Sequence, residues 1–247
     1  MSRLDRIARR FDRAAPTYDQ AAQVQRRIAL ALAEMILAKS PAKGGRVLEL
    51  GCGTGHLTRA LIERLQPELW IAGDIAPAML AALDQGLKHP ALSLKLIDAA
   101  QPDAAPGFDL LCSSLTLQWL SDPAAVINRW RGLVRPGGVL AFSTLLAGSF
   151  GEWRKALVAA GATEPGPALP DLSELHAWLG QGADVRVLDL TEQHADGLSF
   201  MWAARRAGVD AALARTLSAG TLRRALKTFE EAGASIRYRA ALVIVAV

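Results

Sequence analysis

Residues 47–55 read VLELGCGTG, and this run decides the fold. It begins as a short, mostly apolar strand, turns through three glycines and leads into a helix marked by Leu57, Leu61 and Leu65. Glycines let the backbone turn tightly and let a ligand approach where a Cβ would push it away. The run therefore predicts a strand, a glycine turn and a helix, with a polar ligand at the turn.

The chemistry of the turn favours a cationic ligand. Its glycines follow a GxGxG spacing, not the GxGxxG of dinucleotide binding, and Glu49 lies inside the preceding strand. An acid beside the turn suits S-adenosylmethionine, which carries a sulfonium and an ammonium and has no pyrophosphate.

Strands and helices alternate outward from this unit. We expect further strands at 69–73, 92–97, 108–113, 139–145, 185–190 and 236–247, and helices at 77–87, 124–134, 150–160 and 172–179, with helical patterns over 197–232. Such alternation predicts an α/β, doubly wound, Rossmann-like fold with a seven-stranded, mostly parallel sheet. The helical stretch before the last strand is predicted to be a lid insert.

Two helices are predicted ahead of the glycine turn. Residues 3–15 form an amphipathic pattern that we expect Pro16 to end, and an apolar stripe over 24–36 predicts a second helix.

We interpret residues 1–247 as one domain. Its expected parts are N-terminal helices over 1–40, a cofactor-binding half over 46–145, and a substrate half over 146–247 that includes the insert 197–232.

Composition excludes several classes of protein. With 51% hydrophobic and 21% charged residues in 247, the chain is neither disordered nor fibrous. Its two cysteines, Cys52 and Cys112, show no metal-ligand spacing, so we expect no metal and a cytoplasmic location. No apolar run is long enough for a signal core or a membrane span, so no membrane association is expected.

The formal net charge of +4 is unevenly distributed. Residues 1–27 hold seven Arg against three Asp, and residues 200–239 hold eight Lys or Arg against three acids. This favours a local docking patch, and no nucleic-acid-binding module accompanies the charge. The candidates are Arg3, Arg6, Arg9, Arg10 and Arg13, for which a plain solvated helix face is an equal interpretation.

Two more acids lie at predicted strand ends. Asp74 follows the second strand, where the doubly wound fold presents an acceptor for ribose hydroxyls, and Asp98 follows the third, where it could accept from an adenine amino group.

The motifs VLELGCGTG, GDIAPAML, LIDA, FDLLCSSLTLQWL and RPGGVLAFSTL resemble those of class I S-adenosylmethionine-dependent methyltransferases. The segments FDRAAPTYDQAAQVQRR, SLTLQWL, STLLAGSF and YRAALVIVAV are similar to the malonyl-acyl-carrier-protein O-methyltransferase (BioC) family of biotin synthesis. This resemblance implies methyl transfer from S-adenosylmethionine to the free carboxylate of a malonyl thioester on acyl carrier protein, or of malonyl-CoA.

The resemblance and the strand-end pattern together give the candidate site. The cofactor-binding candidates are Gln25, Glu49, Gly51, Cys52, Gly53, Gly55, Asp74, Ile75, Met79, Asp98, Ala99 and Ser114. The catalytic candidates are Tyr18, Gln118, Trp119, Arg205 and Arg206, with one arginine as counter-ion to the carboxylate. A carboxylate is already ionised at pH 7, so no general base is required, and His56 is not expected to transfer a proton.

Three alternatives stay open at this point. One is a carboxyl methyltransferase for a small free polyacid such as trans-aconitate. A second is a methyltransferase for a carbon or phenol nucleophile, which would need a base or metal. The third is a non-catalytic protein that binds S-adenosylmethionine.

Overall fold

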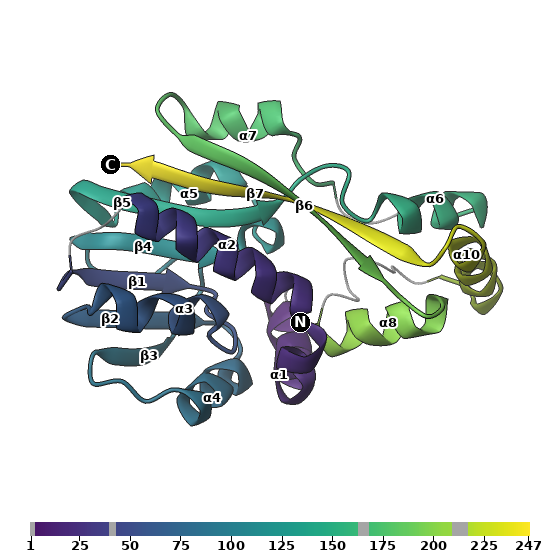
Figure 1. The fold of residues 1–247 in the computed structure, drawn as a ribbon, viewed down its shortest axis with the longest axis horizontal. Helices are drawn as coiled ribbons and strands as arrows, with labels where there is room; N and C mark the ends of the chain where they lie inside the picture. Colours follow the sequence, from purple (N-terminus) through teal and green to yellow (C-terminus); the bar gives the residue numbers. More distant parts are fainter. Residues whose placement is uncertain (1–2, 40–42, 163–167, 209–216) are drawn as a thin grey trace.

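The computed structural model describes residues 3–39, 43–162, 168–208 and 217–247. One sheet forms the centre of the molecule (Figure 1). Its strands are β1 (Arg46–Leu50), β2 (Leu69–Asp74), β3 (Leu92–Leu96), β4 (Phe108–Ser114), β5 (Val134–Leu145), β6 (Asp184–Gln193) and β7 (Ser235–Ala246). The spatial order is β3-β2-β1-β4-β5-β7-β6, which confirms the predicted seven-stranded sheet.

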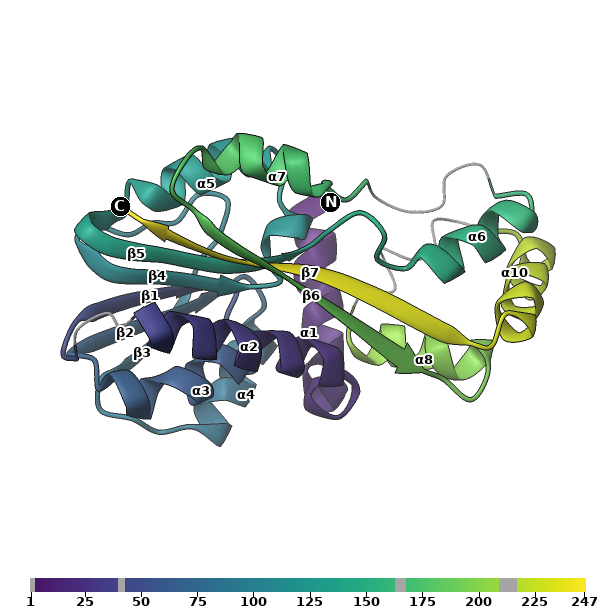
Figure 2. The ribbon, with the colours of Figure 1, turned by 45° about the horizontal axis from the view of Figure 1, so that its top comes forward.

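The helices are α1 (Arg3–Ala21), α2 (Gln23–Lys39), α3 (His56–Leu65), α4 (Pro77–Gly86), α5 (Pro123–Arg131), α6 (Gly151–Ala159), α7 (Leu172–Leu179), α8 (Gly197–Arg206) and α10 (Ala219–Glu231), with a 3₁₀ turn η1 (Leu117–Trp119). Helices α2 and α3 cover one face of the sheet and α5 and α7 the other (Figure 2).

Side chains of the central strands alternate between two cores. Val47 packs in the core under α2 and α3, whereas Leu48 and Leu50 pack in the core under α5 and α7. A strand covered on both faces needs apolar residues at nearly every position, which explains the continuous apolar pattern of the sequence.

Strand β7 is the exception to parallel pairing. It runs antiparallel to both β5 and β6, and Gln193 at the end of β6 is paired with Ser235 at the start of β7. The chain leaves and re-enters the sheet at the same end, so β7 has to run backward.

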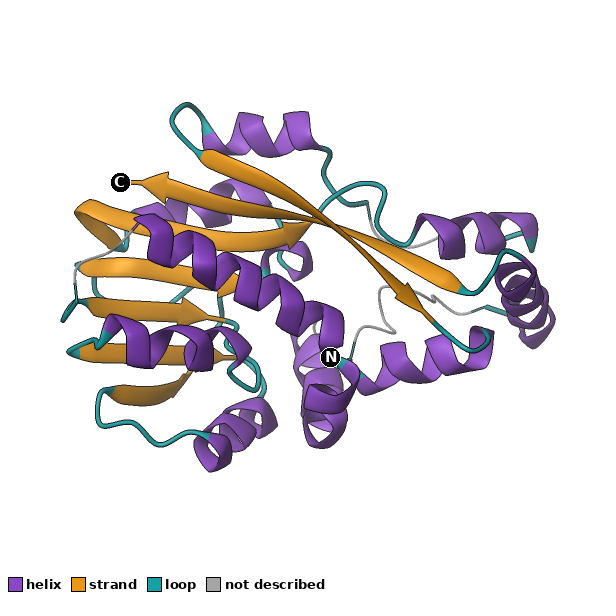
Figure 3. Cartoon of the chain, in the orientation of Figure 1, coloured by secondary structure: helices purple, strands orange, loops and turns teal. Residues whose placement is uncertain are grey.

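Beyond the central sheet, the β6–β7 pair extends to a second cluster of helices, α6, α8 and α10 (Figure 3). Three buried rings from these helices pack together there. The centroid of Trp153 lies 5.3 Å from that of Phe200 and 5.7 Å from that of Phe229. The predicted insert over 197–232 therefore contains α8 and α10, while its residues 209–216 lie outside the described part of the chain.

Two predicted boundaries were wrong. Pro16 does not end the first helix, because α1 continues to Ala21. Burial of Ala14 and Ala15 and a bond from the Thr17 hydroxyl to the Arg206 carbonyl (3.3 Å) stabilise the chain on both sides of the proline. Strand β5 starts at Val134, five residues early, with an irregularity in its pairing with β4 before Val139.

Among the described residues, no helix is both long enough and apolar enough to cross a membrane.

Candidate active site

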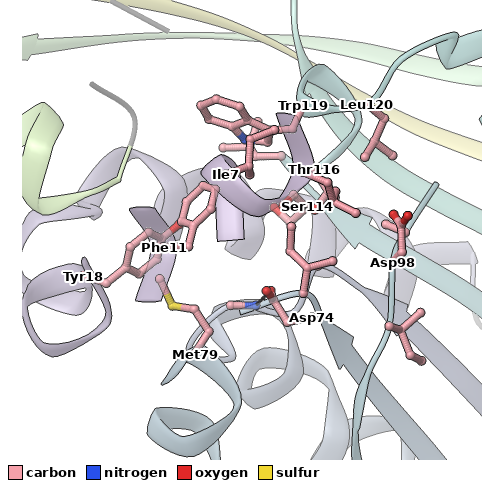
Figure 4. Close-up of a pocket in the computed structure, with 17 residues that line it drawn as sticks. Ile7, Phe11, Tyr18, Asp74, Met79, Asp98, Ser114, Thr116, Trp119 and Leu120 are labelled. Atoms are coloured by element: carbon pink, nitrogen blue, oxygen red, sulfur yellow. Dashed lines mark hydrogen bonds between the residues drawn. The ribbon is translucent and has the colours of Figure 1, made fainter. Parts of the chain in front are cut away.

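A pocket opens at the carboxyl ends of β1, β2 and β4, with α1 as the opposite wall (Figure 4). Its empty space of about 630 Å³ includes volume that is open to solvent. The predicted site residues on its wall are Tyr18, Gly51, Gly53, Asp74, Ile75, Met79, Asp98, Ala99, Ser114 and Trp119. All described lining residues belong to the expected N-terminal helices and cofactor half; none comes from 146–247.

Two glycines of the turn have different structural roles. Gly51 has a φ of +70°, and a Cβ there would clash with the Thr116 hydroxyl, so this glycine allows the loop after β4 to pack against the turn. Gly53 has a φ of +54°, and a Cβ there would meet nothing within 4 Å. The backbone at Gly53 thus borders the open space of the pocket.

Four of the five N–H groups of this turn, residues 51–55, have acceptors within the protein. Those of Gly51 and Cys52 both donate to the Gly73 carbonyl, at 2.7 and 3.0 Å, and that of Gly55 donates to the Cys52 carbonyl at 2.9 Å. The Gly53 N–H donates to Asp74 Oδ2 at 2.9 Å. A phosphate needs such donors, so these four N–H groups are not available to a pyrophosphate.

Asp74 lies at the floor of the pocket, at the end of β2 (Figure 4). Besides the bond from Gly53, its Oδ1 accepts from the Ala76 N–H at 2.9 Å. Burial raises the pKa of its carboxyl, although the backbone donors act in the opposite direction. Each carboxylate oxygen retains a lone pair for a ligand hydroxyl.

Asp98 lies on the wall just after β3 and is half-buried. Its Oδ1 accepts from the Ala100 N–H at 2.8 Å, and this bond fixes the carboxylate just beyond the end of β3. Ile97 and Ala99, on either side, also line the pocket and supply apolar surface. The carboxylate can accept a hydrogen bond from the edge of a flat ring ligand, and the apolar side chains can pack against the face of that ring.

Glu49 does not line the pocket. Its carboxylate is buried and accepts from the Thr58 hydroxyl at 2.6 Å and from Trp70 Nε1 at 3.0 Å. Burial raises the pKa of Glu49 to about 7, against the lowering effect of those two bonds. Strand alternation turns Glu49 toward α3 and β2, so its assignment to the cofactor stays a prediction that no contact with the pocket supports.

Helix α1 supplies a wall of which sequence reasoning assigned only Tyr18 to the site. Leu4, Ile7, Phe11 and Tyr18 all line it, and Phe11 meets Trp119 edge to face with centroids 5.6 Å apart. The apolar stripe of α1 was visible in the sequence, but nothing in the pattern said what it covered. The remaining wall residues that the prediction missed are Ile97, Leu115, Thr116 and Leu120.

Three side chains of α1 fix it across the pocket. Asp12 Oδ1 accepts from the Ala78 N–H, at the start of α4, at 2.9 Å. The Thr54 hydroxyl donates to Asp19 Oδ1 at 2.5 Å, and Arg3 Nη1 donates to the Ser121 hydroxyl at 3.2 Å. The helix is thus bound to the glycine turn, to α4 and to the loop after η1.

His56 and Tyr18 stack beside the turn, with ring centroids 5.9 Å apart. Burial lowers the pKa of His56, although Asp19 Oδ1, 3.6 Å from His56 Nε2, acts the other way. Burial and the carboxylates of Asp74 and Asp19 raise the pKa of Tyr18, so its hydroxyl stays protonated. His56 does not line the pocket.

Other predicted residues lie away from the wall. Gln118 has its amide engaged, donating to the Leu115 carbonyl at 2.6 Å and accepting from the Thr144 hydroxyl at 3.4 Å. Cys52 is buried. Gly55, at the start of α3, packs against Leu83 of α4. Gln25 lies on α2 and does not line the pocket either.

The arginines expected as counter-ions are also outside the pocket. Arg205 and Arg206 are exposed at the end of α8. The guanidinium of Arg205 lies 5.9 Å from the Trp202 ring centroid, and Arg206 Nη2 donates to Gln20 Oε1 at 2.8 Å. Their assignment to the substrate carboxylate therefore lacks support from the geometry. No cluster of three metal-binding side chains occurs within the described ranges.

Comparisons with known proteins agree with this geometry. A family of methyltransferase domains matches residues 48–140. The fold superposes on that of a candidate methyltransferase of Bacillus halodurans C-125 with a TM-score of 0.62, over 86% of this chain and 96% of that chain, at 14% identity. Fold and site together define a class I methyltransferase, the class that takes its methyl group from S-adenosylmethionine.

Two relatives identify the family within this class. The chain is 40% identical to the biotin biosynthesis bifunctional protein BioCD of Bordetella avium over 94% of its own length, and spans 50% of that longer protein. It is 31% identical to the malonyl-[acyl-carrier protein] O-methyltransferase of Magnetococcus marinus, over 83% of this chain and 78% of the relative. The chain belongs to the malonyl-[acyl-carrier protein] O-methyltransferase family.

The buried carboxyl of Glu49 predicts a pH-dependent stability. Its pKa is about 7 when folded and near 4.5 when unfolded, so the free energy of unfolding is expected to fall as pH rises through this window. In Glu49→Gln, the fall between pH 5.5 and 8 should shrink by about 1–2 kcal/mol, measured by urea unfolding. Glu63→Gln, at an exposed position on α3, is the matched control; an equal slope in both variants would contradict the prediction.

Asp74→Ala is expected to weaken S-adenosylmethionine binding by about 1.5–3 kcal/mol, because a buried acceptor and its bond to the turn are lost. Calorimetric titration measures the affinity, and circular dichroism checks that the variant is folded. Asp84→Ala removes an exposed carboxylate from α4 and should bind as the wild type does. Unchanged affinity in a folded Asp74→Ala protein would remove Asp74 from the cofactor site.

Proposed function

We propose that the protein transfers a methyl group from S-adenosylmethionine to the free carboxylate of a malonyl thioester on acyl carrier protein, an early step of biotin synthesis. The observation that carries this proposal is the pocket itself, in which two strand-end carboxylates face an apolar and aromatic wall from α1. The names of the relatives, which specify malonyl-[acyl-carrier protein], support the choice of substrate.

The residues present fit the cofactor. Gly53 borders open space that a Cβ would fill, and Asp74 and Asp98 offer acceptors at the ends of adjacent strands. We assign Asp74 to the ribose hydroxyls and Asp98 to the adenine amino group. When bound, S-adenosylmethionine supplies an electrophilic methyl group on its sulfonium, and S-adenosylhomocysteine leaves as the new C–O bond forms.

None of the described residues that line the pocket is a base suited to the reaction, and a carboxylate nucleophile needs none. Tyr18 keeps its proton, and the imidazole of His56 faces Asp19 away from the wall. The contribution of the protein is then to hold both reactants in line and to exclude water. Phe11 and Trp119, packed edge to face, supply apolar surface for that purpose.

The charge of the wall supports a cationic cofactor as partner of an anionic substrate. Within the described part of the chain, the lining residues include Asp74 and Asp98 and no Lys or Arg. An anionic substrate alone would be repelled by this wall, so its charge is balanced by the sulfonium. Both thiols, Cys52 and Cys112, are buried and free, which is compatible with work in a reducing cytoplasm.

Methylation assays with three substrates test the proposal. Malonyl carrier protein, malonyl-CoA and trans-aconitate are each incubated with S-adenosylmethionine, and products are identified by mass spectrometry. We expect the malonyl thioester on carrier protein to gain one CH₂, and the fragmentation pattern of its acyl group to be that of a malonyl methyl ester. Methylation of trans-aconitate alone would contradict the substrate, fragmentation as a methylmalonyl group would contradict the carboxylate nucleophile, and cofactor binding without any product would indicate a binding protein.

The absence of a base predicts a flat pH profile. At saturating substrates, turnover should vary by less than about twofold between pH 6 and 8.5, since no group on the wall has to change its protonation state. His56→Asn should keep turnover within about threefold, because His56 packs beside the turn and does not face the pocket. A bell-shaped profile that disappears in His56→Asn would favour a nucleophile that must lose a proton.

A further inference from the structure

Helix α8 presents an apolar stripe to solvent. Leu198 and Trp202 are 58% and 60% exposed, among the most exposed large apolar side chains of the described residues. Arg205 follows them at helical spacing, with its guanidinium 5.9 Å from the Trp202 ring centroid. These three residues, at i, i+4 and i+7, lie along one face and are called the α8 stripe here.

The opposite face of α8 is firmly anchored. Phe200 and Ala204 are buried, and Phe200 packs on Phe229 of α10 at 5.0 Å between centroids. A capping box between Asp196 and Ser199 fixes the first turn. The stripe is therefore the outer face of a well-held helix and not the side of a fraying end.

The composition of the stripe is that of a protein-binding surface. Tryptophan and arginine dominate the binding energy of protein interfaces, and an exposed tryptophan beside an arginine gains from burial by a partner. Asp196 caps the first turn of α8, whereas Arg205 and Arg206 lie in its last turn, the end nearer to α1, so that end favours an acidic partner. An amphipathic helix with acids along its apolar edge matches both features.

Helix α1 lies between the α8 stripe and the pocket. The chain leaves α8 at Gly208, where a Cβ would lie 3.0 Å from the Phe11 ring, and Phe11 lines the pocket. Arg206, next to the stripe, is bound to Gln20 of α1. A partner seated on α8 would therefore hold a flexible arm beside the wall formed by α1.

We propose that the α8 stripe docks an acidic amphipathic helix of acyl carrier protein and so delivers the malonyl arm to the pocket. This inference rests on the proposed function and adds the docking site to it. The arginines of α1 offer charge as well, but α1 has no large exposed apolar side chain among its described residues. Val158 of α6 and Leu30 of α2 are also exposed, each with two basic residues three and four positions before it. What distinguishes α8 is that the chain at its end packs against Phe11 of the pocket wall.

The test compares a carrier-bound with a free substrate. The double variant Leu198→Ser/Trp202→Ser should raise the Michaelis constant for malonyl carrier protein about tenfold and leave that for malonyl-CoA within twofold. Arg205→Glu should act in the same direction and weaken the salt dependence. The matched control Leu30→Ser/Val158→Ser removes exposed apolar side chains from α2 and α6 and should change neither constant.

The other outcomes are distinct. Equal losses with both substrates would place α8 in the pocket or in the fold and overturn the docking proposal. An unchanged constant for the carrier protein would also overturn it, and a rise in Arg9→Glu/Arg13→Glu alone would move docking to α1. If the wild type methylates neither thioester, the proposed function is wrong and the docking proposal falls with it.

Discussion

The carboxylate of Asp74 connects three parts of the pocket. It accepts the Gly53 N–H from the turn after β1 and the Ala76 N–H at the start of α4, while lying itself at the end of β2. These bonds fix the turn against the neighbouring strand in the one arrangement that leaves Gly53 beside open space. Because the carboxyl is buried, losing either donor would leave an acceptor unsatisfied at a cost of about 1–3 kcal/mol.

Closure of the site depends on contacts between residues far apart in the sequence. Asp12 and Asp19 of α1 accept from Ala78 and Thr54, and Phe11 packs on Trp119. Each contact is modest, about 1 kcal/mol for a hydrogen bond, but together they hold an apolar helix face over the ends of the strands. The wall that excludes water is thus built from the first helix of the chain.

Much of the fold was predictable because its signals are local. The glycine turn, the strand before it and the helix after it follow from residues 47–65, and Asp74 and Asp98 follow from the ends of the next strands. The direction of Glu49 could also have been predicted, since it shares a strand face with Val47 and not with Leu48.

Other features could not be read from local signals. Pro16 fits inside α1 only because tertiary contacts on both sides outweigh the lost backbone bond. The placement of Arg205 and Arg206 outside the pocket depends on how α8 packs against α10 and α1, which no spacing reveals. That the apolar face of α1 covers the pocket likewise depends on tertiary packing, which no spacing in the sequence reveals.

The hydrogen bonds of the turn bear on the class of ligand that this site accepts. A dinucleotide site offers backbone N–H groups to a pyrophosphate, whereas here those of Gly51, Cys52 and Gly53 are consumed by the Gly73 carbonyl and the Asp74 carboxylate. What remains toward the pocket is acceptor and negative charge, from Asp74 and Asp98. A nucleoside with hydroxyls and a positive charge satisfies such a surface, and a polyphosphate is repelled by it. For the proposed anionic substrate, the same negative surface would make binding depend on the cation beside it, so cofactor binding and substrate charge would be linked by the electrostatics of one wall.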